Sequence, residues 1–171
     1  QSKNGVLFNN NLEEIIQYPI GNSRRRYYIP EGVKRIHNYA FLSSSQLERI
    51  LIPESVEEIG EESIYNCKEL IDIYYPTNET KITKYGNNFI GNNEKMKSIK
   101  VGTGYEGVNM NGQQIIKDIE YGMAGTATRY MYSTSYSTLT IYREGEMKGY
   151  SENEERPWEN RKDEISKIEI E

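Results

Sequence analysis

Apolar residues recur at a fixed period of 23 positions along the first hundred residues of the chain. Three prolines, Pro30, Pro53 and Pro76, mark the period, and each follows an apolar or aromatic residue. Around the first two prolines the apolar positions match one for one: Ile29, Val33, Ile36, Phe41, Leu47 and Ile50 against Ile52, Val56, Ile59, Ile64, Leu70 and Ile73. The third unit starts in phase and then runs two to three residues late, which a short loop insertion explains. Such a repeat is typical of a solenoid, in which each unit buries its apolar face only by stacking on its neighbours.

Each unit is expected to open with a short strand. Residues 47–53 alternate apolar and polar side chains at their start and end at a proline, which cannot donate a ladder hydrogen bond. Residues 33–41 and 56–64 space their apolar positions by three to five, which predicts a turn and a short helix behind the sheet. We therefore expect parallel pairing of strands near residues 15–18, 26–29, 49–52, 72–75 and 98–101, with Ile50, Ile52 and Ile73 buried.

The period ends after Val101, and a different module is expected to follow. Glycines and asparagines between residues 102 and 112 form a turn-rich boundary, and residues 115–119, 126–132 and 139–142 alternate as strands do. Residues 165–170 repeat the pattern of residues 47–52 without the proline. The predicted fold class is α/β: residues 1–101 form a solenoid of parallel short strands with short helices or turns. Residues 102–171 form a small β-rich cap or inter-repeat module, with the next repeat beginning near residue 165.

A family resemblance rests on the unit from Leu47 to Leu70. Its pattern, L-x-x-I-x-I-P-x-x-V-x-x-I-G-x-x-x-(F/I)-x-x-C-x-x-L, resembles the BspA-like class of leucine-rich repeat and extends roughly over residues 5–101. The leading stretch resembles a hairpin of such proteins, in which Ile16 and Tyr18 stand in for Ile50 and Ile52. Residues 138–150, followed by Pro157, Trp158 and Ile165, resemble a short β-rich unit that precedes repeat arrays in the same family. The chain departs from the pattern where His37 replaces Gly60, Ser44 replaces Cys67, Arg24 replaces Leu47 and Glu79 replaces Val56.

The resemblance implies a function as well as a fold. BspA-like repeats are similar to those of bacterial and protist surface proteins associated with adhesion to host matrix proteins and cells. The leading hypothesis is therefore a non-catalytic protein-binding module, extracellular or on the cell surface, whose curved sheet binds a host or matrix macromolecule. The alternative is a structural spacer or a glycan-binding accessory domain of a secreted protein, because Trp158 and the tyrosines of residues 121–150 could stack on sugars.

The charge distribution, the lack of a long apolar run and the first residue limit the expected partners and the kind of protein. Residues 1–105 contain 13 Lys/Arg and 13 Asp/Glu, whereas residues 106–171 contain 8 and 13, so the net charge of −5 belongs to the second module. Nucleic acid is therefore not an expected partner. The chain has no apolar run near the roughly 20 residues needed to span a membrane. It shows no signal peptide and begins with Gln1, so we expect a module of a longer protein.

Reactive residues are scarce, and each has a structural interpretation. Cys67 is the single cysteine and His37 the single histidine, so neither a disulfide nor a triad can be assembled. Cys67 is expected to be a small core residue. Acidic pairs such as Glu57 and Glu58 are expected on solvated turns, and the run Arg24–Arg26 either approaches a strand or forms a basic patch. We expect no catalysis, cofactor or metal site.

The predicted binding site is a row of outward side chains on the curved sheet. Because side chains alternate across a strand, superposed repeats place eight residues together on that face. They are Arg26, Tyr28, Arg49, Leu51, Asp72, Tyr74, Ser98 and Lys100. Aromatic and Arg side chains are typical of interface centres, although tyrosine is also common on exposed strands.

Overall fold

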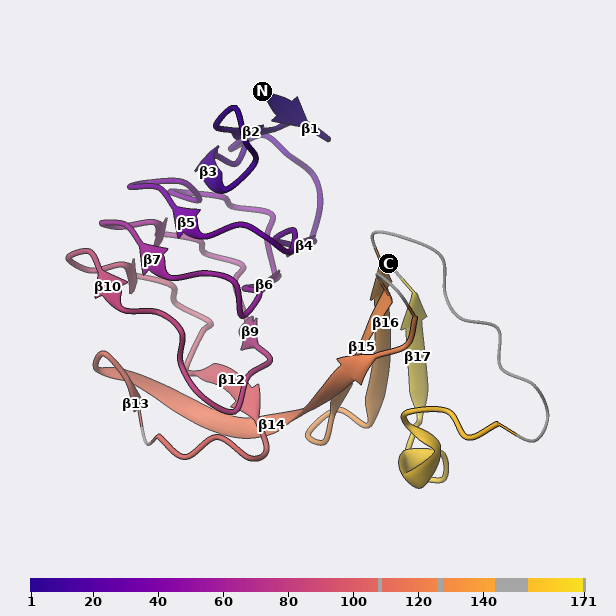
Figure 1. Ribbon diagram of the computed structural model, residues 1–171. Helices are drawn as coiled ribbons and strands as arrows, with labels where there is room; N and C mark the ends of the chain where they lie inside the picture. Colours follow the sequence, from indigo (N-terminus) through magenta and orange to yellow (C-terminus); the bar gives the residue numbers. More distant parts are fainter. Residues whose placement is uncertain (108, 126–127, 144–153, 171) are drawn as a thin grey trace.

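The structure is a computed structural model that describes residues 1–107, 109–125, 128–143 and 154–170. Short strands and turns stack into a solenoid, and a long strand at its end leads into a second layer (Figure 1). The largest sheet of the described residues has nine strands, of which β13 (Asn109–Met110) pairs only with β14. The other eight follow the order β17 (Lys167–Ile170), β16 (Thr138–Arg143), β15 (Thr128–Ser133), β14 (Gln113–Met123), β12 (Ile99–Gly102), β9 (Asp72–Tyr75), β6 (Arg49–Leu51) and β4 (Arg26–Tyr28).

The repeats build the β4, β6, β9 and β12 part of this sheet as expected. These strands pair in parallel, with Arg26 opposite Arg49, Arg49 opposite Asp72 and Ile73 opposite Ile99. Ile50, Ile52 and Ile73 are fully buried in the main core. The predicted solenoid, its parallel pairing and its inward positions are therefore confirmed.

A second sheet runs along another side of the stack. Its order is β1 (Ser2–Lys3), β2 (Val6–Phe8), β3 (Glu14–Gln17), β5 (Arg35–Ile36), β7 (Glu58–Ile59) and β10 (Lys84–Tyr85). A third, two-stranded sheet joins β8 (Ile64–Tyr65) to β11 (Ile90–Gly91) in parallel. The strand expected at residues 15–18 is thus present as β3, but it lies in the second sheet.

The place of β3 corrects the expected equivalence of the leading hairpin. Ile15 pairs with Ile36 rather than with the strand that contains Ile50, so Ile16 does not stand in for Ile50. Ile15 and Tyr18 are fully buried, whereas Ile16 is half-buried. The antiparallel hairpin of β2 and β3 therefore extends the second sheet beyond β5, with Glu14 opposite Arg35.

The predicted α/β class is wrong, because the structure is nearly all β. Where short helices were expected, residues 33–41 and 56–64 form the short strands β5 and β7 followed by turns, and the one helical element of the described residues is the 3-10 turn η1 (Glu159–Arg161). The N–H groups of the first turn are used between units: Phe41 donates to the carbonyl of Ser63 at 2.7 Å, and Ser43 to that of Tyr65 at 2.9 Å. A backbone N–H bonded to the next unit cannot also close an α-helical turn.

Close stacking of these turns explains the glycine at position 60. A Cβ atom on Gly60 would lie 2.4 Å from the side-chain oxygen of Asn38 and 2.8 Å from the carbonyl carbon of His37. A Cβ atom on Gly86 would likewise lie 2.1 Å from the backbone nitrogen of Glu61. His37 occupies this position in the first such turn of the stack, where its side chain is exposed.

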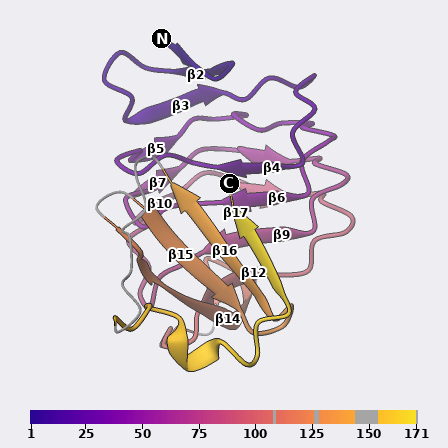
Figure 2. The same cartoon turned by 90° about the vertical axis from the view of Figure 1, so that its right-hand side faces the viewer.

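The second module extends the solenoid sheet and then folds back over it. β14 pairs in parallel with β12, with a register shift between Val101 and Gly102, and β15 and β16 follow as antiparallel neighbours. β17 pairs in parallel with β16. In Figure 2, β15, β16 and β17 lie in front of the strands of the solenoid sheet. The sheet continues across the predicted boundary near residue 101, and the division into two domains stays a prediction.

Candidate functional site

The expected exposure of the binding row is wrong for most of its members. Leu51, Asp72, Tyr74, Ser98 and Lys100 are buried, with exposed fractions of 1%, 3%, 4%, 8% and 6%. The physical reason is the fold of β15, β16 and β17, which cover the outer face of the solenoid sheet (Figure 1). The other three members, Arg26, Tyr28 and Arg49, are half-buried. A binding role for the row stays a prediction.

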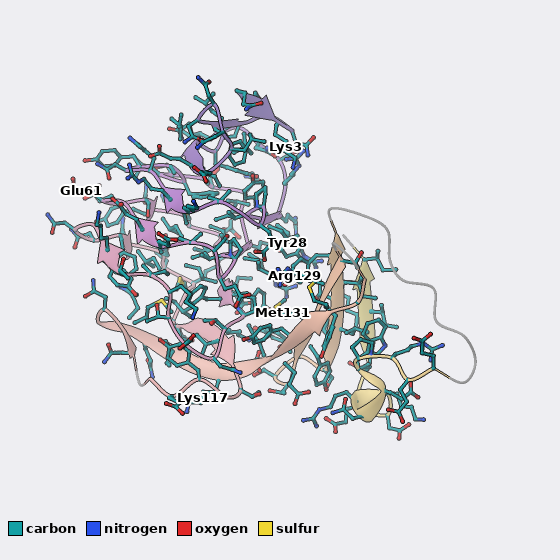
Figure 3. The ribbon with its side chains drawn as sticks, viewed as in Figure 1. Lys3, Tyr28, Glu61, Lys117, Arg129 and Met131 are labelled. Atoms are coloured by element: carbon teal, nitrogen blue, oxygen red, sulfur yellow. The ribbon has the colours of Figure 1, made fainter. Side chains whose placement is uncertain are left out.

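Strands β15, β16 and β17, which we call the cover, contact the row through an apolar cluster. Leu51 and Tyr74 of the solenoid pack in one cluster with Ile119, Met131 and Tyr142 of the second module. Figure 3 shows Tyr28 on the solenoid side of this contact and Met131 on the cover side. The rings of Tyr28 and Tyr142 stack with their centroids 5.3 Å apart. Burial raises the pKa of the Tyr74 and Tyr142 hydroxyls, so both stay neutral.

An ion pair at the edge of the cover adds to this contact. The Nε atom of Arg129 on β15 lies 3.0 Å from a carboxylate oxygen of Glu31, which follows the first repeat strand. Arg129 lies opposite Tyr142, whose ring stacks on Tyr28, and Figure 3 labels both Arg129 and Tyr28. The cover is therefore fixed to the solenoid by charge as well as by apolar packing.

A buried lysine occupies the far end of the row. Lys100 Nζ lies 3.6 Å from a carboxylate oxygen of Asp72 and 3.4 Å from one of Asp118. It also lies 3.8 Å from the ring centroid of Tyr136, a cation–π distance. Two carboxylates and an aromatic face thus compensate for the burial of this ammonium group.

Asp118 is held ionised by hydroxyl groups at the end of β15 and in the loop after it. Its carboxylate accepts hydrogen bonds from the hydroxyls of Ser133 at 2.6 Å, Thr134 at 2.8 Å and Ser135 at 2.5 Å, and from the backbone N–H of Ser135 at 2.7 Å. Burial alone would raise the pKa of this carboxyl, but the hydrogen bonds outweigh burial and lower it. Asp118 therefore links the loop to the solenoid through Lys100.

Three cations meet one carboxylate where β17 faces β4 and β6. A carboxylate oxygen of Glu169 lies 2.8 Å from Arg26 Nη2 and 2.6 Å from Lys167 Nζ, and the other oxygen lies 3.7 Å from Arg49 Nη1. Burial would raise the pKa of Glu169, but the hydrogen bonds from Lys167 and Arg26 lower it. The negative charge of Glu169 is therefore retained at neutral pH.

A cleft of about 210 Å³ opens between the solenoid sheet and the cover. Residues from both layers line it: Tyr28, Arg49, Tyr74, Met131, Ser133, Tyr136, Thr138, Thr140, Lys167 and Glu169. The binding row and the second module thus meet in one site, which we call the row cleft. Its wall combines tyrosine rings, hydroxyl groups and charges of both signs, which suits the recognition of a polar group.

The remaining candidate residues lie outside the row cleft. Cys67 is buried and its thiol donates to the carbonyl of Phe41 at 3.0 Å; burial raises the pKa of this thiol to about 11. It is a core residue, but it does not end a helix. Arg24 donates to the carbonyl of Asn4 at 3.0 Å, and Arg25 pairs with Glu48 at 2.8 Å.

Trp158 lies on the other face of the cover. Its ring meets that of Tyr130 edge-on, 5.5 Å between centroids, and packs against the cluster of Tyr132, Leu139 and Ile141. This supports an anchoring role for Trp158. Residues 144–150, which carry part of the family resemblance, lie outside the described residues.

Asp118 and Glu169 are among the residues of the site that were not singled out from the sequence, and Tyr136 was named only among the tyrosines of residues 121–150. Asp118 interrupts an apolar strand segment, and Glu169 occupies the place of Leu51 when residues 165–170 are aligned with residues 47–52. An acid at the position held by Tyr28, Leu51 and Tyr74 in the repeats was a usable signal. Tyr136 lies in a polar turn, where the sequence offered only the aromatic ring itself.

The described part of the chain contains no cluster of three or more His, Cys, Asp or Glu side chains that could ligate a metal ion. Within the same residues, no helix is long and apolar enough to cross a membrane.

Comparisons with known proteins agree with the solenoid. Residues 3–113 match a family model described as the BspA type leucine rich repeat region, in six copies. A leucine-rich repeat protein from Eubacterium ventriosum is 27% identical with a TM-score of 0.54, and the match covers 58% of this chain and 26% of that one. The pneumococcal vaccine antigen PcpA is 22% identical with a TM-score of 0.50, covering 68% of this chain and 34% of that one. The chain therefore spans about a third or less of the length of both proteins. A comparison with curated proteins found no match.

Proposed function

The chain belongs to the BspA-type leucine-rich repeat family, and from that premise we propose that it is a non-catalytic protein-binding module of an exported or cell-surface protein. Its recognition is of the adhesion type and is directed at a host or matrix macromolecule. A stack of repeats provides a rigid, broad surface, and rigidity lowers the entropic cost of binding.

The row cleft is the observation that carries the proposal. Tyr28 and Arg49 keep part of their surface and line the cleft with Tyr136 and Lys167 of the second module, and Arg26 pairs with the lining residue Glu169. Tyr and Arg are enriched where interfaces become desolvated. We therefore propose that the partner contacts the mouth of the row cleft rather than the full row, because Leu51 and Tyr74 belong to the packing between the layers.

The test is a binding panel with the purified chain. Immobilised matrix proteins and host cells are one arm, and a glycan array is the other. Tyr136→Ala should weaken binding to a protein target by about 1 to 2 kcal/mol. Tyr39→Ala is the matched control, because both tyrosines are 43% exposed and Tyr39 lies in a turn after β5. Signal on glycans alone would favour the accessory-domain alternative, and no signal in either arm would favour a spacer.

We also propose that β17 is the first strand of a further repeat. The N–H groups of Ser166 and Lys167 both donate to the carbonyl of Ser137, at 2.8 and 3.3 Å. Inside the array, the N–H groups of Glu48 and Arg49 both donate to the carbonyl of Arg25, at 2.7 and 3.1 Å. Ser166→Pro removes one donor, and amide hydrogens of residues 167–170 should then exchange faster. Unchanged exchange would contradict this equivalence.

A further inference from the structure

The side chain of Arg49 is the least satisfied charged group of the row cleft. Its Nε atom is buried without a hydrogen-bond partner, 3.4 Å from Asp72 and outside hydrogen-bond geometry. Nη1 reaches Glu169 only at 3.7 Å, and no hydrogen bond joins this guanidinium to the described residues. Arginine carries five N–H donors, and leaving a donor unpaired inside a protein costs free energy. The cleft therefore offers a donor fork to an acceptor from outside.

Charge at the mouth of the cleft favours an anion. Arg26, Arg49 and Lys167 surround the carboxylate of Glu169, and Arg49 also faces Asp72, which shares Lys100 with Asp118. Four cations of this network therefore face three carboxylates, which leaves one positive charge in excess. Arg26 and Lys167 hold Glu169 at 2.8 and 2.6 Å, closer than Arg49 at 3.7 Å. The Nη groups of Arg49 therefore remain as donors for a further carboxylate.

Resting on the protein-binding function proposed above, we propose that the row cleft takes the carboxylate of an acidic side chain of the partner protein. The two carboxylate oxygens meet the two Nη groups of Arg49, whose paired N–H donors match carboxylate geometry, while Nε stays buried beside Asp72. Lys167, with a side chain 59% exposed, adds charge from the rim. The rings of Tyr28 and Tyr136 line the same cleft and flank the methylene groups of the side chain. About 210 Å³ accommodates one such side chain.

The probe for this site is N-acetyl-L-glutamic acid α-amide, with N-acetyl-L-glutamine α-amide as the neutral isostere. NMR titration at constant ionic strength follows the Nε–H of Arg49 and the amides of β6 and β17. The acidic probe should give saturable shifts, and the neutral probe none. Arg49→Gln should weaken the acidic probe roughly tenfold, since charge-assisted hydrogen bonds are the stronger class. Arg35→Gln is the matched control, because Arg35 pairs with Glu14 and Glu58 on the second sheet.

Other outcomes of this titration would overturn the proposed carboxylate site. Equal shifts with the neutral probe, or no saturable shift with either, would overturn the carboxylate site. A third arm with D-glucuronate tests the other source of carboxylate, and shifts with glucuronate alone would overturn the polypeptide assignment. If Arg49→Gln did not fold, Lys167→Gln at the exposed rim provides the same test, and it should lower the affinity for the acidic probe a few-fold. A protein partner whose affinity is unchanged by Arg49→Gln would overturn this inference while leaving the protein-binding function intact. Conversely, binding of the acidic probe by a chain that binds no protein in the panel would overturn the function and leave the site.

Discussion

Leu51 distinguishes an exposed binding row from a covered one. If its side chain were exposed on the sheet, Leu51→Ala would change the free energy of unfolding by no more than about 0.5 kcal/mol. In the structure Leu51 is 1% exposed and belongs to the cluster that joins the two layers. Truncation removes three carbon atoms at about 0.8 kcal/mol each, and the cavity left behind raises the loss to about 3 kcal/mol.

Urea unfolding followed by two probes measures this loss. Far-ultraviolet circular dichroism reports the whole chain, and fluorescence of Trp158 reports the second module, where that side chain packs. Leu7→Ala is the matched control, because Leu7 is 42% exposed on β2. We expect Leu51→Ala to shift the midpoint of both probes together and Leu7→Ala to leave both nearly unchanged.

The opposite result would refute the packing of β15, β16 and β17 on the solenoid sheet. A Leu51→Ala variant as stable as Leu7→Ala would mean that β15, β16 and β17 do not pack on the solenoid in solution. Deleting residues 106–171 supplies an independent check, because it would uncover Leu51 and Tyr74 as an apolar surface. Lower stability or aggregation of the shortened chain is expected, and unchanged unfolding and solubility would show that the two modules are independent.

Three further predictions follow from individual contacts. Gly60→Ala should cost more than about 1 kcal/mol in urea unfolding, because the new Cβ would lie 2.4 Å from Asn38 Oδ1; an equally stable variant would show that the turns can separate. Asp118 and Glu169 have lowered pKa values, so the stability they contribute is present above their unfolded pKa near 4 and is lost as pH falls through the folded values. The urea midpoint should therefore hold from pH 7 to about 5 and fall below about pH 4, less steeply in Asp118→Asn, and a parallel fall in that variant would contradict the assignment. The Cys67 thiol, with its pKa raised to about 11, should react slowly with a thiol reagent at pH 8 and quickly in urea. Fast reaction of the native protein would place Cys67 at the surface.

The repeats were predictable because their pattern is local and recurs position for position in two successive units. Matching apolar positions fix which side chains of β4, β6 and β9 face inward, and a shift of one residue would expose Ile50 and Ile73. The helix was not predictable from the same spacing. Apolar positions three to five apart fit a helix or a stacked turn equally well, and the choice depends on backbone bonds such as that from Phe41 to Ser63 in the next unit.

The cover could not be inferred because alternation within a strand does not say what lies on either face. Strands with alternating residues were expected between residues 115 and 142, and both of their faces are in fact occupied. Met131 packs toward the solenoid in one cluster, and Tyr132 packs in the other with Trp158. The repeats alone predict that the row points away from the solenoid core, which it does. In the structure the row also points toward the second layer, so most of it is buried between the two. Glu169, at the place of Leu51, fits this burial between layers, because β17 directs its carboxylate at Arg26 and Arg49.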